Sequence, residues 1–168
     1  MLEVGILSRN ITIVCLNDFL RKEAGKELAK INKMFYLDID EMLDFELISR
    51  SQVSIKCGDE YLHKLEQDCI KRVAEYENCV YSISPDMFLA NDNKVYLKDT
   101  SVVYLNTDMH NIDVSKIRNK NEKIKIMQDM EVFDNINGFL IATCPYVVED
   151  ADMKSLKDIV VEIKSKIK

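Results

Sequence analysis

The sequence predicts an α/β domain of three layers, with helices on both faces of a five-stranded parallel sheet. Five short runs of β-branched and apolar residues are spread through the 168 residues, and segments with helical spacing separate most of them. Such runs are typical of strands buried on both faces, and parallel strands need connections long enough to hold a helix. No linker or repeat divides the chain, so we expect a single domain over residues 1–168.

The first strand and the first helix follow one another directly. Residues 11–16, ITIVCL, form a β-branched apolar run that predicts a buried strand. Asn17 and Asp18 come next, and both residue types cap helix N-termini. Apolar residues then recur at helical spacing to about residue 33, which predicts a helix packed on the sheet. They are Leu20, Ala24, Leu28 and Ile31.

The second strand is predicted at residues 34–39 and ends in carboxylates. Asp40 then has the residue type of an N-cap for a short helix that ends near Leu47. Gly58 opens a longer helix, and a third strand follows at residues 78–83. The apolar stripe of the longer helix consists of Tyr61, Leu62, Leu65, Cys69, Ile70 and Val73.

The C-terminal half continues the alternation. Strands are predicted at residues 101–105 and 145–149. Between them, residues 109–131 are rich in Lys and Asn and are expected to be helical in part, and a further helical segment leads to the fifth strand. The last helix begins near Asp152 and turns four apolar residues inward, namely Leu156, Ile159, Val160 and Ile163.

Composition excludes several classes of function. The net charge of −6 argues against nonspecific binding to nucleic acid or to an anionic membrane. The sequence contains no run of about 18 apolar residues, so no membrane span is predicted, and the N-terminus lacks the pattern of a signal peptide. The five cysteines include no C-x-x-C pair, which favours reduced thiols in the cytoplasm over a zinc site or disulfides. We therefore expect a cytoplasmic protein.

Glycine is unusually scarce. The chain has four glycines, whereas average usage of about 7% would give roughly 12. A glycine-rich loop that binds phosphate is therefore in doubt.

Several stretches of the chain, in order, resemble shikimate kinases. They are NITIVCLNDFLRKEAGKELAK, FYLDIDEML, GDEYLHKLEQDCI, SVVYLNTD and YVVEDADMKSLKDIVVEI. The resemblance implies a P-loop kinase topology and the phosphorylation of the 3-hydroxyl of shikimate by Mg²⁺-ATP. The residues that match are mostly scaffold.

The phosphate loop of that family, G-x-x-G-x-G-K-[ST], falls on residues 15–22. Its three glycines become Cys15, Asp18 and Leu20, whose Cβ atoms disfavour the backbone conformations that direct successive N–H groups at an anion. We expect Asp18 to cap the helix instead. Arg21 falls where the family lysine binds phosphate, and Lys22 falls where a hydroxyl would bind Mg²⁺.

Two readings of this segment stay open. The segment is either a divergent nucleotide site that retains Arg21 and Lys22 as phosphate-binding positions or a plain capped turn. A shift of the alignment by one residue would place Lys22 on the lysine position and Glu23 on the Mg²⁺ position, still without the glycines.

On the acceptor side, the resemblance assigns Asp40 to binding and activating the shikimate hydroxyl. It assigns Asp38 to the metal ion through water, if Mg²⁺-ATP binds. Asp40 is equally well explained as a helix N-cap. His63 replaces the first substrate-binding arginine and is expected either to bind substrate or to be an ordinary surface histidine.

Other substrate positions of the family differ more. The second substrate-binding arginine falls near Ile136, and the family's glycine triplet falls on residues 84–86, Ser-Pro-Asp. The segment of residues 109–131 matches the lid without its R-P-L context, so it is either a residual lid or a solvated helical face.

Three hypotheses follow. We favour a shikimate-kinase-like protein that has lost phosphoryl transfer, needs no cofactor and binds a small molecule or a protein partner. Phosphoryl transfer depends on positioning and charge neutralisation, and the residues that provide both in the family are replaced here. The alternative is a divergent but active shikimate kinase that uses Mg²⁺-ATP. A third is an enzyme of the same fold that acts on another small phosphorylated molecule.

Overall fold

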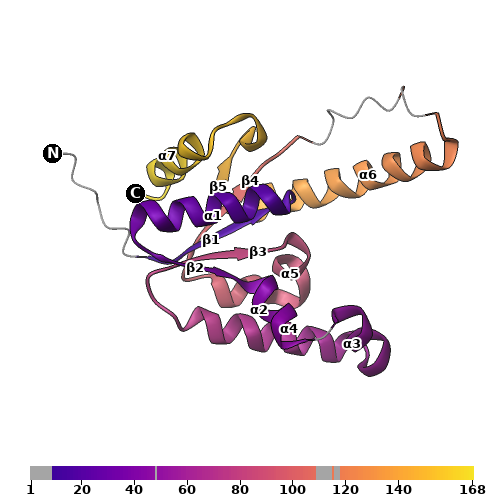
Figure 1. The fold of residues 1–168 in the computed structure, drawn as a ribbon, viewed down its shortest axis with the longest axis horizontal. Helices are drawn as coiled ribbons and strands as arrows, with labels where there is room; N and C mark the ends of the chain where they lie inside the picture. Colours follow the sequence, from indigo (N-terminus) through magenta and orange to yellow (C-terminus); the bar gives the residue numbers. More distant parts are fainter. Residues whose placement is uncertain (1–8, 48, 109–114, 116–117) are drawn as a thin grey trace.

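A five-stranded parallel sheet forms the centre of the structure (Figure 1). The computed structural model describes residues 9–47, 49–108, 115 and 118–168. The strands run in the order β2-β3-β1-β4-β5, and each neighbouring pair is parallel. Their bounds are Ile11–Cys15 (β1), Phe35–Asp38 (β2), Cys79–Ile83 (β3), Ser101–Leu105 (β4) and Tyr146–Val148 (β5). The predicted fold class is confirmed.

Helices cover both faces of the sheet, as Figure 1 shows. One face packs against α1 (Asp18–Asn32) and α7 (Leu156–Lys166). The opposite face packs against α2 (Ile39–Glu46), α4 (Asp59–Ala74), α5 (Pro85–Leu89) and the 3₁₀ helix η1 (Ala90–Leu97). Every residue of β1, β3 and β4 is buried, as expected for central strands of a sheet covered on both faces.

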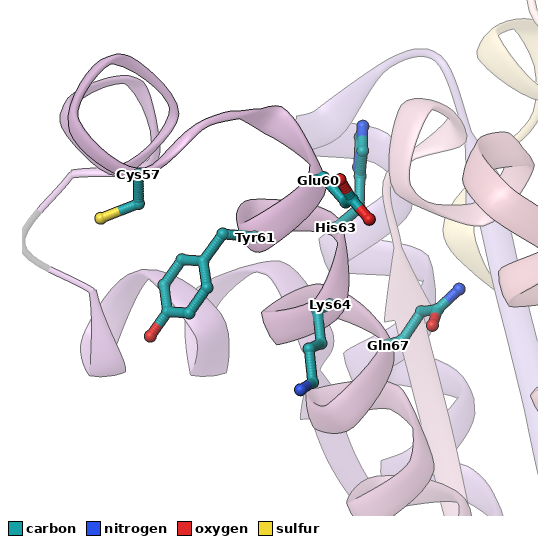
Figure 2. A pocket seen from close by; sticks show the side chains of 6 residues that line it. All are labelled: Cys57, Glu60, Tyr61, His63, Lys64 and Gln67. Atoms are coloured by element: carbon teal, nitrogen blue, oxygen red, sulfur yellow. The ribbon is translucent and has the colours of Figure 1, made fainter.

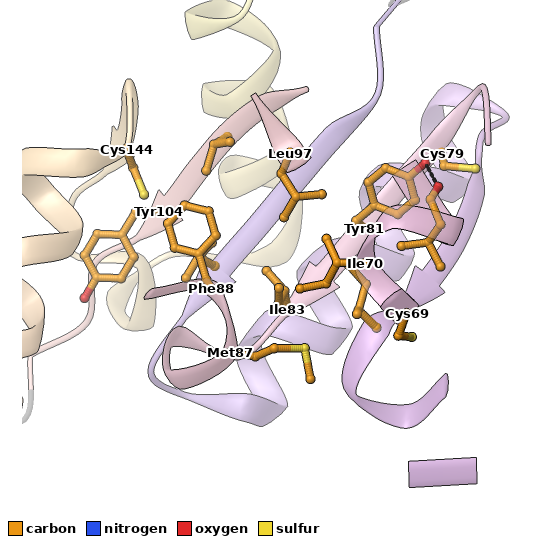
Figure 3. Packing of buried hydrophobic residues seen from close by; sticks show 14 of the residues in the cluster. Cys69, Ile70, Cys79, Tyr81, Ile83, Met87, Phe88, Leu97, Tyr104 and Cys144 are labelled. Carbon is orange, nitrogen blue, oxygen red and sulfur yellow. Dashed lines mark hydrogen bonds between the residues drawn. The ribbon is translucent and has the colours of Figure 1, made fainter. Parts of the chain in front are cut away.

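Two buried tyrosines on the strands β3 and β4 bind the helices α4 and α6 (Lys120–Thr143) to the sheet (Figure 3). The Tyr81 hydroxyl donates to the Val73 carbonyl at 2.6 Å, which ties β3 to the end of α4. The Tyr104 hydroxyl donates to Asn137. Burial raises the pKa of both phenols, so both stay neutral donors over the physiological range.

A glycine lets α1 approach the edge of the sheet. A Cβ on Gly25 would lie 2.6 Å from Cε2 of the Tyr36 ring on β2, well inside van der Waals contact. The scarce glycine at this position therefore serves helix packing.

Several boundaries differ from the sequence-based prediction. The strand predicted at residues 34–39 ends at Asp38, because Ile39 already begins α2. The last helix begins at Leu156 with Ser155 as its N-cap, and a short 3₁₀ helix, η3 (Ala151–Met153), precedes it. The helix α3 (Arg50–Cys57) was not predicted, since it buries no residue and has no apolar stripe.

The helix before β5 is longer than its pattern suggests. The helix α6 spans Lys120–Thr143, and its C-terminal half packs on the body through Phe133 and Leu140. Its N-terminal half extends away from the body (Figure 1). Of the predicted lid, residues 109–114 and 116–117 lie outside the described residues. No helix in the described part of the chain has the length and apolar character needed to cross a bilayer.

Candidate functional site

The turn between β1 and α1 lies at the carboxyl end of the sheet and is very short. Only Leu16 and Asn17 separate the strand from the helix. The Asn17 side chain accepts the Leu20 N–H at 3.0 Å, and its carbonyl accepts the Arg21 N–H at 2.9 Å. Asn17 is therefore the cap, and the expectation that Asp18 caps the helix was wrong by one residue. Asp18 is instead the first helical residue.

Arg21 points into the protein from the first turn of α1. Its side chain is only 2% exposed. Nε donates to Ser82 Oγ on β3 at 2.9 Å, and Nη1 donates to Asp18 Oδ1 at 2.8 Å. Nη2 lies 4.0 Å from Asp40 Oδ2. The guanidinium thus holds the turn, β3 and α2 together, and its donors face groups of its own chain.

Lys22 connects α1 to the start of α2. Its Nζ donates to Glu41 Oε1 at 2.6 Å and lies 3.9 Å from Asp38 Oδ2. The hydrogen bond with Glu41 raises the pKa of Lys22, and the same bond lowers the pKa of Glu41. Both groups are therefore charged across the physiological range.

Asp38 is the N-cap of α2. Its Oδ1 accepts the Glu41 N–H at 2.9 Å, and its Oδ2 accepts the Tyr36 hydroxyl at 3.3 Å. Asp38 is a buried residue, so these bonds replace the water that its carboxylate loses. The structure therefore gives the capping role, which the sequence analysis allowed for Asp40, to the residue two positions earlier.

Asp40 lies in the first turn of α2 and faces the end of β3. Its carboxylate accepts the Ser84 N–H at 2.7 Å and the Ser84 hydroxyl at 2.6 Å. Arg50 adds a third bond, from Nη1 to Asp40 Oδ1 at 3.2 Å. The segment aligned with the family's glycine triplet thus uses its first backbone N–H to hold Asp40. Both carboxylate oxygens are engaged by the chain itself.

Arg50 is a site residue that the sequence analysis missed. It lies at the start of α3, donates from Nη2 to the Asp40 carbonyl at 2.9 Å, and pairs through Nε with Asp44 at 2.6 Å. The available signal was an arginine ten positions after Asp40. The two come together only because the start of α3 lies beside the first turn of α2.

His63 lies apart from this network, on the exposed side of α4. Its Nδ1 lies 2.9 Å from Glu66 Oε2, one helical turn away, and its side chain is 40% exposed. It borders an open groove of about 710 Å³. In Figure 2, Cys57 and Tyr61 extend to one side of α4 and His63 to the other. The structure therefore brings together Arg21, Lys22, Asp38 and Asp40, but not His63.

A smaller hollow of about 300 Å³ lies at the carboxyl end of β4. It is bordered by the β4 end, α6 and the loop after β5, and three of its lining residues are the acids Asp108, Asp134 and Asp150. Among the described residues, no group of three or more His, Cys, Asp or Glu side chains is arranged to hold a metal ion. The hollow is thus acidic, which disfavours anionic ligands.

Cys15 is the last residue of β1, and its thiol is buried and unreactive. Burial raises the pKa of its thiol to about 12. The thiolate is the nucleophilic form of cysteine, so this residue is inert at neutral pH.

Comparison with known proteins gives one family. The profile described as shikimate kinase matches residues 22–167, and this match begins one residue after Arg21. No curated protein sequence matches the chain.

Solved structures agree on the fold. A shikimate kinase from Acinetobacter baumannii, in complex with shikimate, superposes with a TM-score of 0.68 at 18% identity, covering 97% of each chain. The shikimate kinase from Aquifex aeolicus vf5 gives 0.69 at 18% identity, over 94% of this chain and 95% of that one. A gluconokinase from Sinorhizobium meliloti 1021 gives 0.53 at 13% identity, over 95% and 91%.

Proposed function

The chain belongs to the shikimate kinase family, and from this premise we propose that it is a member that has lost phosphoryl transfer and works by binding. Its ligand would be a small molecule or a protein partner. The observation that carries the proposal is Arg21, because the side chain that the resemblance places at the family's phosphate-binding position is buried in bonds to its own chain.

The β1–α1 turn supports this proposal through its backbone. A phosphate needs several N–H groups directed at one point, and glycine allows the chain conformation that does so. Here the N–H groups of Leu20 and Arg21 are bound by Asn17. Asp18 adds a carboxylate at the helix N-terminus, where the helix dipole would otherwise attract a phosphate.

The residues present do not fit Mg²⁺-ATP. In the first alignment Lys22 falls at the position of the hydroxyl that would bind the metal, and an ammonium has no lone pair for Mg²⁺. In the alignment shifted by one residue, Glu23 takes the metal position, and the loop still lacks its glycines. Asp38, the candidate for a water-mediated contact, is occupied as a helix cap. We therefore derive no catalytic step that uses the nucleotide.

The substrate side gives further support. An acceptor hydroxyl would have to compete for Asp40 with Ser84 and Arg50, which already donate three hydrogen bonds to its carboxylate. The position of the first substrate-binding arginine is His63, which pairs with Glu66 instead. An imidazole lacks the two-pronged geometry with which arginine binds a carboxylate.

An active, divergent shikimate kinase is the second candidate, and one observation favours it. Arg21, Lys22, Asp38 and Asp40 meet at the carboxyl ends of β1 and β2, where ligands of parallel α/β sheets bind. In that case the internal bonds of Arg21 would have to open when the nucleotide binds.

Thermal unfolding with nucleotide separates the two candidates. A ligand at 100 times its Kd stabilises a protein by about 2.7 kcal/mol, which corresponds to a rise in Tm of about 5–10 °C for a domain of this size. We expect no such rise with millimolar Mg²⁺-ATP, and no ADP release with shikimate. Shikimate alone is tested in parallel, since a binding protein can retain the substrate site.

The control is a shikimate kinase with an intact phosphate loop, run under the same conditions. A saturable rise in Tm with Mg²⁺-ATP, together with ADP release that Asp40→Asn abolishes, would overturn the proposal. A rise with shikimate alone would support a binding function and identify its ligand class.

A further inference from the structure

The N-terminal half of α6 is an exposed helix with apolar and charged residues in one stripe. It extends away from the sheet (Figure 1), and Ile124 and Met127 on it are 45% and 55% exposed. Lys120 and Lys123 lie in its first turn, where the positive end of the helix dipole disfavours cations. Among the residues that the structure describes, neither the packing of the chain nor the helix dipole accounts for these residues.

The stripe is complementary to itself about Met127. Offsets of three, four and seven residues return to the same face of an α-helix. Two lysines lie seven and four residues before Met127, and two acids lie four and seven residues after it. The apolar residues Ile124 and Met130 lie three residues before and three residues after Met127. The full stripe is Lys120, Lys123, Ile124, Met127, Met130, Glu131 and Asp134.

We propose that this stripe, the α6 stripe, pairs two copies of the chain antiparallel, with Met127 on the twofold axis. A twofold axis through Met127 places a residue that lies before Met127 opposite the residue of the second copy that lies equally far after it. Lys123 then meets Glu131 of the second copy, and Ile124 meets its Met130. In the same register, Lys120 meets Asp134 of the second copy, and the two copies of Met127 meet at the axis.

The charges select this arrangement over a parallel one. A parallel pair in register would set Lys123 against Lys123 and Glu131 against Glu131, and both contacts are repulsive. Lys123 and Glu131 are eight residues apart in one helix, too far to pair with each other. Their attraction is available only across two chains.

The size of the contact predicts a weak, reversible dimer. The mirrored segment covers residues 120–134, which is about 22 Å of helix. A contact between two helix faces of this length belongs with weak, transient interfaces, so we expect a Kd between about 1 μM and 1 mM. This inference is independent of the proposed loss of phosphoryl transfer, because the α6 stripe includes none of the four residues of the site network.

Sedimentation equilibrium with charge-reversed variants tests the dimer. Wild-type protein should dimerise between about 1 μM and 1 mM. Lys123→Glu and Glu131→Lys should each weaken self-association at least tenfold. Mixing the two variants should restore dimers, because each chain then presents to the other the charges that it lacks. Lys157→Glu and Glu75→Lys, on α7 and after α4, are the matched controls and should leave dimerisation unchanged.

Cysteine cross-linking tests the register. In a Cys57→Ser background, Met127→Cys should form a disulfide-linked dimer on mild oxidation. Val132→Cys should not, although Val132 is equally exposed at 56%, because it lies on another face of α6. Monomers at every concentration, variants that weaken dimers no more than the controls, no restoration on mixing, or equal cross-linking at both positions would each overturn the proposal.

Discussion

Removing the Arg21 guanidinium should destabilise the fold and leave ATP without effect. We take Arg21→Met, which keeps most of the buried side-chain volume. The substitution removes the bond to the Ser82 hydroxyl on β3 and the pair with Asp18. It also removes the positive charge that faces Asp40 at 4.0 Å.

The magnitude follows from the burial of each partner. A hydrogen bond from a charged group to a buried hydroxyl contributes about 1.5–3 kcal/mol, and the loss of a pair with an exposed acid such as Asp18 costs under about 1 kcal/mol. Removing one member of a fully buried ion pair costs about 3–5 kcal/mol. Asp40 keeps its bonds to Arg50 and Ser84, so leaving Asp40 without the Arg21 charge costs less than that. We expect a total of about 3 kcal/mol, or about 6–12 °C in Tm.

Urea unfolding followed by circular dichroism measures this difference. Lys26→Met is the matched control, because it removes a cation from the same helix whose pair with Glu23 is exposed. It should cost under about 1 kcal/mol. Equal stability of the two variants would refute the structural role of Arg21. A rise in Tm with Mg²⁺-ATP that is present in wild type and lost in Arg21→Met would instead identify Arg21 as a phosphate ligand.

Three further predictions concern single side chains. Cys57 is the one exposed thiol among the described cysteines, so a thiol reagent should modify one cysteine per native chain and all five after unfolding. The lowered pKa of Glu41 means that its pair with Lys22 stabilises the fold above about pH 4.5 and is lost as the pH falls through the folded-state pKa. The stability difference between wild type and Glu41→Gln, under about 1 kcal/mol, should therefore shrink as the pH is lowered below 4.5 in urea titrations. Gly25→Ala should destabilise by about 1–3 kcal/mol because its methyl overlaps the neighbouring tyrosine ring, whereas Gly138→Ala, with open space, should be neutral or stabilising in the same assay.

The sheet could be predicted from the sequence because strand signals are local. The β-branched runs at β1, β3 and β4 are buried on both faces, and burial of both faces is what selects such residues. The helix α3 was missed because it packs too little to need an apolar stripe. The extent of α6 was missed because its apolar residues do not keep to one face along the whole of Lys120–Thr143.

The candidate site could be predicted in part. Local spacing placed Asp38 and Asp40 at one strand end, where they are found. The role of each carboxylate depended on where α2 begins, since that residue decides that Asp38 caps the helix and that Asp40 binds Ser84 and Arg50 instead. His63 was assigned from alignment alone, and its neighbour in the helix, Glu66, holds it.

By itself, the sequence determined the succession of the five strands along the chain, the family resemblance and the lack of glycine in the β1–α1 turn. These depend on residue types and on spacings of a few positions. Only the tertiary structure decided that Arg21 is buried and that Arg50 and Ser84 engage Asp40. Arg21 and Ser82 are 61 positions apart, and Asp40 and Ser84 are 44 apart. Contacts at such separations form only when the sheet brings β1, β2 and β3 side by side, and no local pattern encodes them.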